Sequence, residues 1–271
     1  MNKKVFFLLF VTMQVFSQQV SFKGTLLDAK TKLPVVYANI SFLDSDIGIS
    51  SKEDGTFLMY IQEKYLESKI HISCLNYKDT VVLASHLNGK TFLMQSKINE
   101  LEEVILSKRV DKTIELDKVK RKVYAVHSVG MRMLAKYFPN DKKYNCCEYI
   151  TNIQLNFSKK HNKKSKFRVR LFDRDPITGL PKNDVLNSNY SVTLKKGQLK
   201  VILNLSEFNI QMPKNGLFVA FEKLFIPFNA YGKKKNESNA EVLYAPVIGF
   251  TKYKYRKEKD RAYYYVKGKW T

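Results

Sequence analysis

Aromatic side chains gather near the C-terminal end of the chain, at spacings that could serve sugar binding. Tyr253 and Tyr255 are two residues apart, as are Tyr263 and Tyr265, and the only tryptophan is Trp270. In a strand, residues two apart point to the same face. An exposed row of aromatic rings stacks on the apolar side of a sugar ring, so these residues are candidates for glycan binding. Aromatic side chains of strands also pack well inside a sheet. The alternative is therefore that these residues belong to the core.

A basic stretch lies earlier in the same part of the chain. Arg168 and Arg170 share one face of a predicted strand. The neighbouring lysines are Lys159, Lys160, Lys163, Lys164 and Lys166, with no acidic residue among them. We therefore predict that the two arginines bind an anionic glycan or a lipid head group, and a solvated sheet face is the alternative. Glu222, in an apolar strand, is either an edge residue or an ion-pair partner of these arginines.

Three aspartates, Asp173, Asp175 and Asp184, frame one predicted loop. Their carboxylate oxygens are the ligand type that Ca²⁺ prefers. Their spacing matches no known calcium loop, however, and the Asp-Pro and Thr-Gly pairs between them are ordinary turn formers. The sequence therefore favours a turn over a Ca²⁺ site, and we expect no cofactor.

The chain shows no familiar catalytic motif. A zinc peptidase needs a His-x-x-Glu pair and a later histidine, but none of the four histidines is followed by glutamate at that spacing. No Gly-x-Ser-x-Gly elbow and no glycine-rich phosphate loop occurs. We therefore predict a protein that is not an enzyme, without catalytic or metal-binding residues. The rival is a glycan-active hydrolase, which needs paired carboxylates about 5–10 Å apart.

The three cysteines cannot all pair within one chain, because their number is odd. Cys74 lies in an alternating strand and is predicted to be a small core residue. Cys146 and Cys147 are adjacent, and a disulfide between neighbours is strained. We expect them to be ordinary strand residues.

The segment from 126 to 271 is predicted to contain short strands separated by Gly, Pro and Asn. The strands are expected at 130–138, 149–157, 166–172, 198–205, 216–224, 249–256 and 262–269. Such regular spacing favours a β-sandwich of jelly-roll type. The pattern, chiefly at 167–171, 175–181 and 215–222, is similar to jelly-roll accessory modules of secreted bacterial proteins, some of which bind carbohydrate.

The segment from 20 to 95 contains strands in a fixed order, with Asp54-Gly55 predicting a hairpin turn between two of them. Family positions are filled by Gly24, Pro34, Ala38, Asn39, Glu53, Asp54, Gly55, Phe57 and Tyr77, with Asn76 where glycine is usual. On these residues the segment resembles the carboxypeptidase regulatory-like domain, a transthyretin-like β-sandwich. The resemblance implies a module that accompanies an activity and rarely carries one.

Domains of this type also occur in TonB-dependent outer-membrane receptors, followed there by a Leu-x-Glu-Val stretch. Leu101, Glu103 and Val104 match that stretch. Only 164 residues follow Ser107, too few for a plug and a large barrel. The resemblance therefore implies that this chain occupies the same compartment as these receptors and has an outer-membrane protein as a partner. The chain itself is expected to contain neither plug nor barrel.

The N-terminus supports export. Lys3 and Lys4 precede an apolar stretch that reaches Phe16, which predicts a secretory signal peptide ending at Ser17. No later apolar run has the length of a transmembrane helix. We expect a protein of the periplasm or outer-membrane surface of a Gram-negative bacterium, with little access to nucleic acid. The net charge of +22 suits an anionic envelope polymer as partner, or reflects a lysine-rich proteome.

Together these features predict an all-β protein of two β-sandwich domains joined by a short charged, partly helical linker. The predicted boundaries are 1–17 for the signal peptide, 18–97 for the regulatory-like sandwich, 98–125 for the linker and 126–271 for the jelly-roll-like sandwich. The predicted function is a secreted, non-catalytic binding or accessory protein of the cell envelope, with a glycan as ligand of the C-terminal sandwich. The alternatives are a glycan-active hydrolase and a scaffolding subunit of an outer-membrane assembly.

Overall fold

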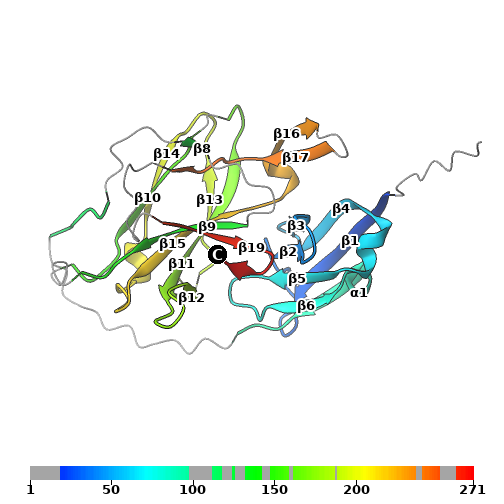
Figure 1. The fold of residues 1–271 in the computed structure, drawn as a ribbon, viewed down its shortest axis with the longest axis horizontal. Coiled ribbons are helices and arrows are strands. Elements are labelled where there is room, and N and C mark those ends of the chain that lie inside the picture. Colours follow the sequence, from blue (N-terminus) through cyan, green and yellow to red (C-terminus); the bar gives the residue numbers. More distant parts are fainter. Residues whose placement is uncertain are drawn as a thin grey trace, which may run out of the picture.

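The structure, a computed structural model, describes most of the chain after the predicted signal peptide. The described residues are 19–97, 112–117, 124–125, 132–141, 147–158, 161–186, 188–235, 240–250 and 261–271. Within them nearly all regular structure is β (Figure 1), and the α-helix α1 (Ala84–Leu87) is about one turn long. The predicted all-β class is confirmed. No helix in these ranges is long and apolar enough to cross a membrane.

The N-terminal half, 19–97, contains two sheets that enclose one core. One sheet has the order β4-β1-β7 and the other β3-β2-β5-β6. The strands are β1 (Gln19–Asp28), β2 (Asn39–Phe42), β3 (Gly48–Ser50), β4 (Thr56–Gln62), β5 (Lys69–Ser73), β6 (Thr80–Leu83) and β7 (Lys90–Met94), with a 3₁₀ turn at Glu63–Glu67. Phe22, Phe42 and Phe57 meet in the core, because alternate residues of each strand face inward.

The turn at Asp54 and Gly55 connects the two sheets. Gly55 has φ of +76°, and an Asp54 carboxylate oxygen accepts a hydrogen bond from Thr56 N at 2.9 Å. Strand β3 before the turn pairs with β2, whereas β4 after it pairs with β1. A turn is present as predicted, but the predicted hairpin is wrong, because the flanking strands belong to different sheets.

A seven-stranded sheet dominates the C-terminal half, from 124 onward. Its order is β12-β11-β15-β9-β19-β20, with β13 also paired to β11. Its strands are β9 (Met133–Phe138), β11 (Ser165–Arg174), β12 (Pro181–Asp184), β13 (Ser191–Leu194), β15 (Leu217–Lys223), β19 (Ala262–Val266) and β20 (Lys269–Trp270). The smaller pairs are β8 (Tyr124–Ala125) with β18 (Gly249–Phe250), β10 (Asn152–Asn156) with β14 (Lys200–Asn204), and β16 (Ala230–Lys235) with β17 (Ala240–Tyr244). Short 3₁₀ turns lie at Ser206–Phe208 and Pro227–Asn229.

Both faces of the large sheet are covered at strand β11. Phe167, Val169 and Leu171 face one core, in which residues of β10 and β14 also pack. The intervening Arg168 and Arg170 point to the other face, where Arg168 contacts the N-terminal half. The two halves also meet where the Ser50 N–H of β3 donates a hydrogen bond to the carbonyl oxygen of Phe225, just after β15. Burial on both sides explains why every residue from 167 to 172 is buried.

Candidate functional site

Arg168 lies at the contact between the two halves and is fully buried. Its Nη2 donates a hydrogen bond to the carbonyl oxygen of Tyr37 at 2.5 Å, and its Nη1 lies 3.7 Å from Cys74 Sγ. Its Nε lies 3.5 Å from a carboxylate oxygen of Glu222, the residue opposite Arg168 in the register of β11 and β15. Of the two alternatives for Glu222, an edge residue or an ion-pair partner of an arginine, the structure shows the ion pair. The Arg168 guanidinium is turned to the protein's interior and is not exposed to solvent.

Arg170 is also buried, and its partner is Asp184 of β12. Its Nε and Nη2 donate hydrogen bonds to the two carboxylate oxygens at 2.9 and 2.5 Å, a two-pronged pairing that fixes orientation. The predicted anion-binding face of Arg168 and Arg170 is therefore an internal face. Alternation shows which residues share a side of a strand, but it does not show what covers that side.

The described aromatic candidates pack within the large sheet. Tyr263 and Tyr265 are buried in β19, and Trp270 is half-buried in β20. The Trp270 ring centre lies 5.2 Å from that of Tyr265 and 5.5 Å from that of Phe172. These rings do not form an exposed row. The other two candidates, Tyr253 and Tyr255, lie outside the described residues.

The three loop aspartates have separate partners. Asp173 accepts a hydrogen bond from the backbone of Asn183 at 2.7 Å, Asp175 binds backbone amides of its own turn, and Asp184 holds Arg170. In the ranges that the structure describes, no group of three or more His, Cys, Asp or Glu side chains could hold a metal ion. The aspartates therefore serve the turn and the sheet edge.

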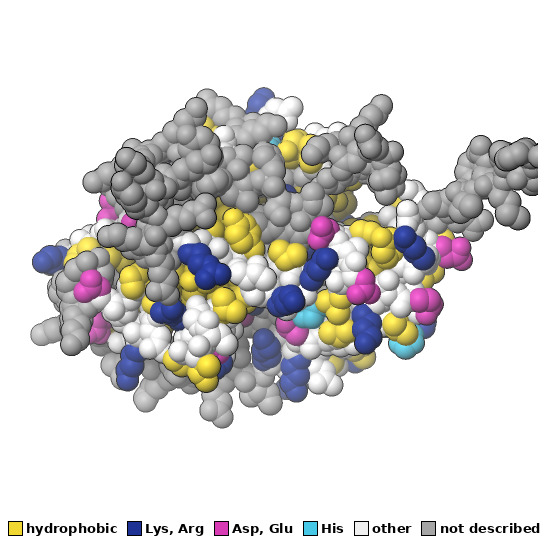
Figure 2. All heavy atoms as spheres, viewed as in Figure 1, with side chains coloured by type: hydrophobic (Ala, Val, Ile, Leu, Met, Phe, Trp, Pro, Cys, Tyr) yellow, Lys and Arg dark blue, Asp and Glu magenta, His cyan; other side chains and the backbone are white. Residues whose placement is uncertain are grey.

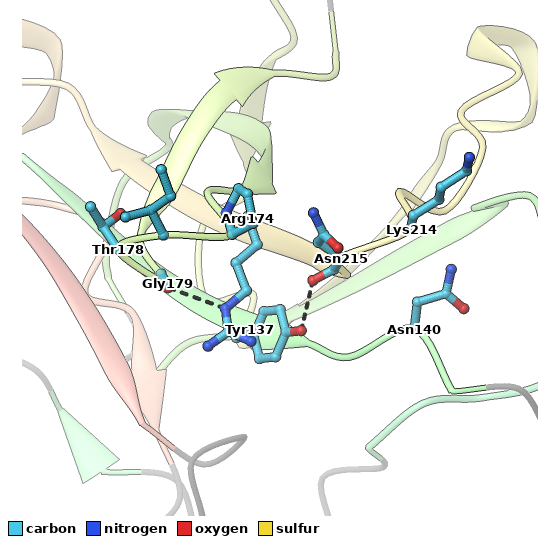
Figure 3. A pocket seen from close by; sticks show the side chains of 9 residues that line it. Tyr137, Asn140, Arg174, Thr178, Gly179, Lys214 and Asn215 are labelled. Atoms are coloured by element: carbon cyan, nitrogen blue, oxygen red, sulfur yellow. Dashed lines mark hydrogen bonds between the residues drawn. The ribbon is translucent and has the colours of Figure 1, made fainter.

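A cavity of about 400 Å³ opens where strands of the large sheet end, and it is the strongest candidate site (Figure 3). Tyr137 comes from the end of β9 and Arg174 from the end of β11, whereas Asn215 lies just before β15. These strands are neighbours in the sheet, so their ends meet at one edge. The lining residues are Tyr137, Asn140, Arg174, Pro176, Ile177, Thr178, Gly179, Lys214 and Asn215.

The turn from β11 to β12 forms one wall of this cavity. An Asp175 carboxylate oxygen accepts hydrogen bonds from the backbone N–H groups of Ile177 and Thr178 at 2.8 and 3.3 Å. The Ile177 amide is the main reason why the pKa of Asp175 is below its ordinary value. Gly179 closes the turn with φ of +71°, a backbone conformation that suits glycine. This aspartate therefore shapes the wall and does not line the cavity.

Tyr137 supports the floor and positions Arg174 (Figure 3). Its hydroxyl donates a hydrogen bond to the backbone oxygen of Asn215 at 2.8 Å. The Arg174 guanidinium carbon lies 4.8 Å from the Tyr137 ring centre, and its Nε donates to the Gly179 carbonyl at 3.4 Å. A cation above an aromatic face is attracted to it. Arg174 is therefore held between a ring and a turn, at the wall of the cavity.

The cavity offers positive charge and hydrogen-bonding groups. Arg174 and Lys214 are cationic, Asn140 and Asn215 carry carboxamides, and Thr178 carries a hydroxyl. Asn140, Lys214 and Thr178 are exposed to solvent. None of the nine described lining residues is a carboxylate, a histidine, a cysteine or a serine. Such a lining can bind hydroxyl and anionic groups of a ligand.

None of these lining residues was a predicted site residue. The turn at 175–181 and the strand at 215–222 are recognisable in the sequence, because Gly, Pro and Asn residues mark them. What the sequence does not show is that the end of β11 and the start of β15 lie beside the end of β9. Knowledge of the strand order would have placed Arg174, Lys214 and Asn140 at one edge.

No model of a known protein family matches this chain, and no curated protein matches it.

Proposed function

We propose that this chain is an exported, non-catalytic binding protein of the cell envelope, and that the cavity at the edge of its large sheet binds a glycan. The observation that carries the proposal is the lining of that cavity. Two carboxamides, a hydroxyl, a guanidinium and an ammonium group line a cavity of about 400 Å³. Ligand sites are typically concave spaces of this size with a few convergent polar groups, and sugars are rich in the hydroxyl groups that such a lining hydrogen-bonds.

The N-terminal half would serve as the accessory module, in line with its resemblance to the carboxypeptidase regulatory-like domain. Its contact with β11 supports this role, because Arg168 makes a buried hydrogen bond to Tyr37. This contact fixes the position of β11, and Arg174 lies at the end of the same strand. A rigid strand positions a binding residue more accurately than a loop does.

A scaffolding role is the second candidate, favoured by a separate observation. Strand β4 carries two exposed apolar side chains on one face, Leu58 at 47% and Tyr60 at 67% exposure. Neighbouring exposed apolar residues mark contact surfaces between proteins. Under this candidate, an outer-membrane protein would cover this sheet face, and Tyr60→Lys would abolish co-purification without changing glycan binding.

The proposal is tested by measuring glycan binding of the purified protein by calorimetry, using neutral and acidic oligosaccharides. We expect Arg174→Ala to weaken binding about tenfold or more, because a hydrogen bond to a charged group is worth roughly 1.5–3 kcal/mol. Lys200→Ala is the matched control, because Lys200 is an exposed cation on β14 and does not line the cavity. Equal affinities of Arg174→Ala and the unaltered protein would contradict the site.

A further inference from the structure

Strand β4 is an edge of its sheet in the N-terminal half (Figure 1). It pairs with β1 on one side, and no other strand in the described part of the chain pairs with it. The pairing with β1 is unbroken from Gln19 opposite Gln62 to Thr25 opposite Thr56, without a bulge. The other side of β4 therefore presents a regular row of backbone N–H and C=O groups, to which a further strand can bind.

The backbone groups on the free side of β4 belong to Leu58 and Tyr60. In an antiparallel pair, only alternate residues of a strand bond to the neighbouring strand. The Gly55 carbonyl oxygen accepts a hydrogen bond from Leu26 N of β1 at 2.9 Å, so the odd-numbered residues of β4 bond to β1 and the even-numbered ones do not. The groups of Thr56 are already bonded within the preceding turn. A partner strand would thus bond to Leu58 and Tyr60.

Strand β4 lacks the features that usually block the addition of a strand. Native sheet edges are protected by charged side chains, by proline or by being short. The seven residues of β4, Thr-Phe-Leu-Met-Tyr-Ile-Gln, include neither a charge nor a proline. Among the other edges of this half, β3 has three residues, β6 has four, and β7 carries the exposed Lys90. The contrast indicates that β4 is a contact surface.

The residue pattern of β4 is symmetric about its middle residue, Met59. In either direction from it, the strand has an exposed apolar residue, then a buried apolar residue and then a polar residue. The corresponding residues are Leu58 and Tyr60, Phe57 and Ile61, and Thr56 and Gln62. Antiparallel pairing of two such strands about a twofold axis places like opposite like, as a self-complementary interface requires. A foreign strand does not require this symmetry, so the pattern favours a second copy of this chain as the partner.

The distribution of charge agrees with contact between copies at this edge. Residues 18–97 contain nine Lys or Arg and eight Asp or Glu, a net charge of +1, whereas residues 126–271 contain 29 basic and 11 acidic residues, a net charge of +18. Figure 2 shows acidic and basic side chains side by side on the N-terminal half, at its right. Strong net charge opposes self-association. An interface between copies is therefore expected on the nearly neutral half.

We propose that the protein forms a twofold symmetric dimer in which the β4 strands of two copies pair antiparallel. The axis passes at Met59, so Leu58 of each copy lies opposite Tyr60 of the other. Such a pair exchanges backbone hydrogen bonds in both directions, and its aliphatic and aromatic side chains contact each other across the strands. The two three-stranded sheets join into one sheet of six strands, whose outer edges are the β7 strands. The assembly stops at two copies, because each β4 then has a neighbour on both sides.

Sedimentation velocity of the purified full chain over a series of concentrations tests the dimer. We expect an equilibrium between monomer and dimer that shifts to the dimer as the concentration rises. Tyr60→Lys places a charge at the edge, and Tyr60→Pro removes an N–H that does not bond to β1. We expect each to weaken the dimer about tenfold or more. Leu93→Lys is the matched control, because Leu93 is 44% exposed on β7, the opposite edge strand, and should leave the dimer unchanged.

Cysteine variants test the position of the axis. Residues opposite each other at a pair without mutual hydrogen bonds have Cα atoms about 4.5 Å apart, which suits a disulfide. We therefore expect Met59→Cys to give a covalent dimer on mild oxidation. Leu58→Cys is more exposed, but its nearest equivalent in the other copy is a diagonal neighbour about 7–8 Å away, so it should not cross-link. The unaltered protein gives the background from the native cysteines.

Each outcome decides for or against the dimer. A protein that stays monomeric at every concentration would overturn it, and loss of an outer-membrane partner by Tyr60→Lys would then assign the edge to the scaffolding candidate. A dimer that persists in both Tyr60 variants, each shown by circular dichroism melting to be folded, would place the interface elsewhere and overturn the proposal. Equal cross-linking of Leu58→Cys and Met59→Cys would contradict the axis at Met59. None of these results depends on glycan binding, because the cavity lies in the other half.

Discussion

At the scale of single residues, Arg132 carries a buried charge with little compensation. Its side chain is 2% exposed, and its Nε and Nη1 have no hydrogen-bond partner within the described part of the chain. Burial lowers its pKa to about 10, below the ordinary value of 12.5. The guanidinium stacks on the Phe225 ring at 4.2 Å. A shift of this size corresponds to roughly 3 kcal/mol against the charged form in the folded protein at neutral pH.

We therefore expect Arg132→Met to leave the free energy of unfolding unchanged or to raise it by up to about 3 kcal/mol. Methionine is unbranched and apolar, so it fills similar space beside Phe225 without a buried charge. Urea unfolding followed by circular dichroism measures the change. Arg170→Met is the matched control, because it leaves Asp184 without its partner and should cost about 3–5 kcal/mol. A clear loss of stability in Arg132→Met would contradict this view of Arg132.

At the scale of elements, the strands themselves are largely visible in the sequence. The alternation of Phe167, Val169 and Leu171 marks β11, alternation also marks β1, and a continuous apolar run marks β15. Pairing partners are not visible, since alternation is a property of one strand and pairing depends on two. For this reason the Asp54-Gly55 pair predicted a hairpin where the chain changes sheets. The cavity was missed for the same reason, because it forms from strand ends that only the sheet order brings together.

Gly216 lies in the turn before β15 and tests the packing at one of the strand ends that form the cavity. Gly216 has φ of +87°, and a Cβ at this position would lie 2.6 Å from the ring of Tyr137. We expect Gly216→Ala to lower the free energy of unfolding by about 2–4 kcal/mol, from backbone strain together with overpacking. It should also weaken ligand binding, because Tyr137 supports Arg174.

The matched control for this variant is Gly197→Ala. Gly197 has φ of +74°, but no atom lies within 4 Å of the position of its added Cβ. Only the backbone strain should appear there, at about 1 kcal/mol. Thermal unfolding of both variants separates the two effects. Equal losses of stability in the two variants would show that the contact with Tyr137 does not contribute to the effect.

At the scale of the whole molecule, a polar junction joins the N-terminal and C-terminal halves. Arg168 donates a hydrogen bond to Tyr37 across it, and Phe225 N donates one to Ser50 Oγ at 3.0 Å. The Ser50 N–H in turn donates to the Phe225 carbonyl at 3.2 Å. Buried polar groups are costly when they lose their partners. Separating the halves would leave several such groups unpaired, so the junction couples the two halves energetically.

This coupling predicts a single unfolding transition. Trp270 fluorescence reports on the C-terminal half, where its ring packs on Tyr265 and Phe172, and far-ultraviolet circular dichroism reports on both halves. We expect the two signals to change together in urea, as cooperative unfolding requires. Two separate transitions in the unaltered protein would show that the halves are independent.

Arg168 and Glu222 test the electrostatic part of this coupling. Arg168→Met leaves the buried Glu222 without its counter-charge and the Tyr37 carbonyl without its donor, so it should cost about 3–5 kcal/mol. The double variant Arg168→Met with Glu222→Leu removes both charges and should recover most of that loss, since a buried pair is often no more stable than apolar residues of similar volume. A double variant as unstable as Arg168→Met would place the cost in the lost contact with Tyr37 and not in the unpaired carboxylate. In either case the junction determines whether β11 stays buried on both faces. The sequence of either half taken alone does not reveal this junction.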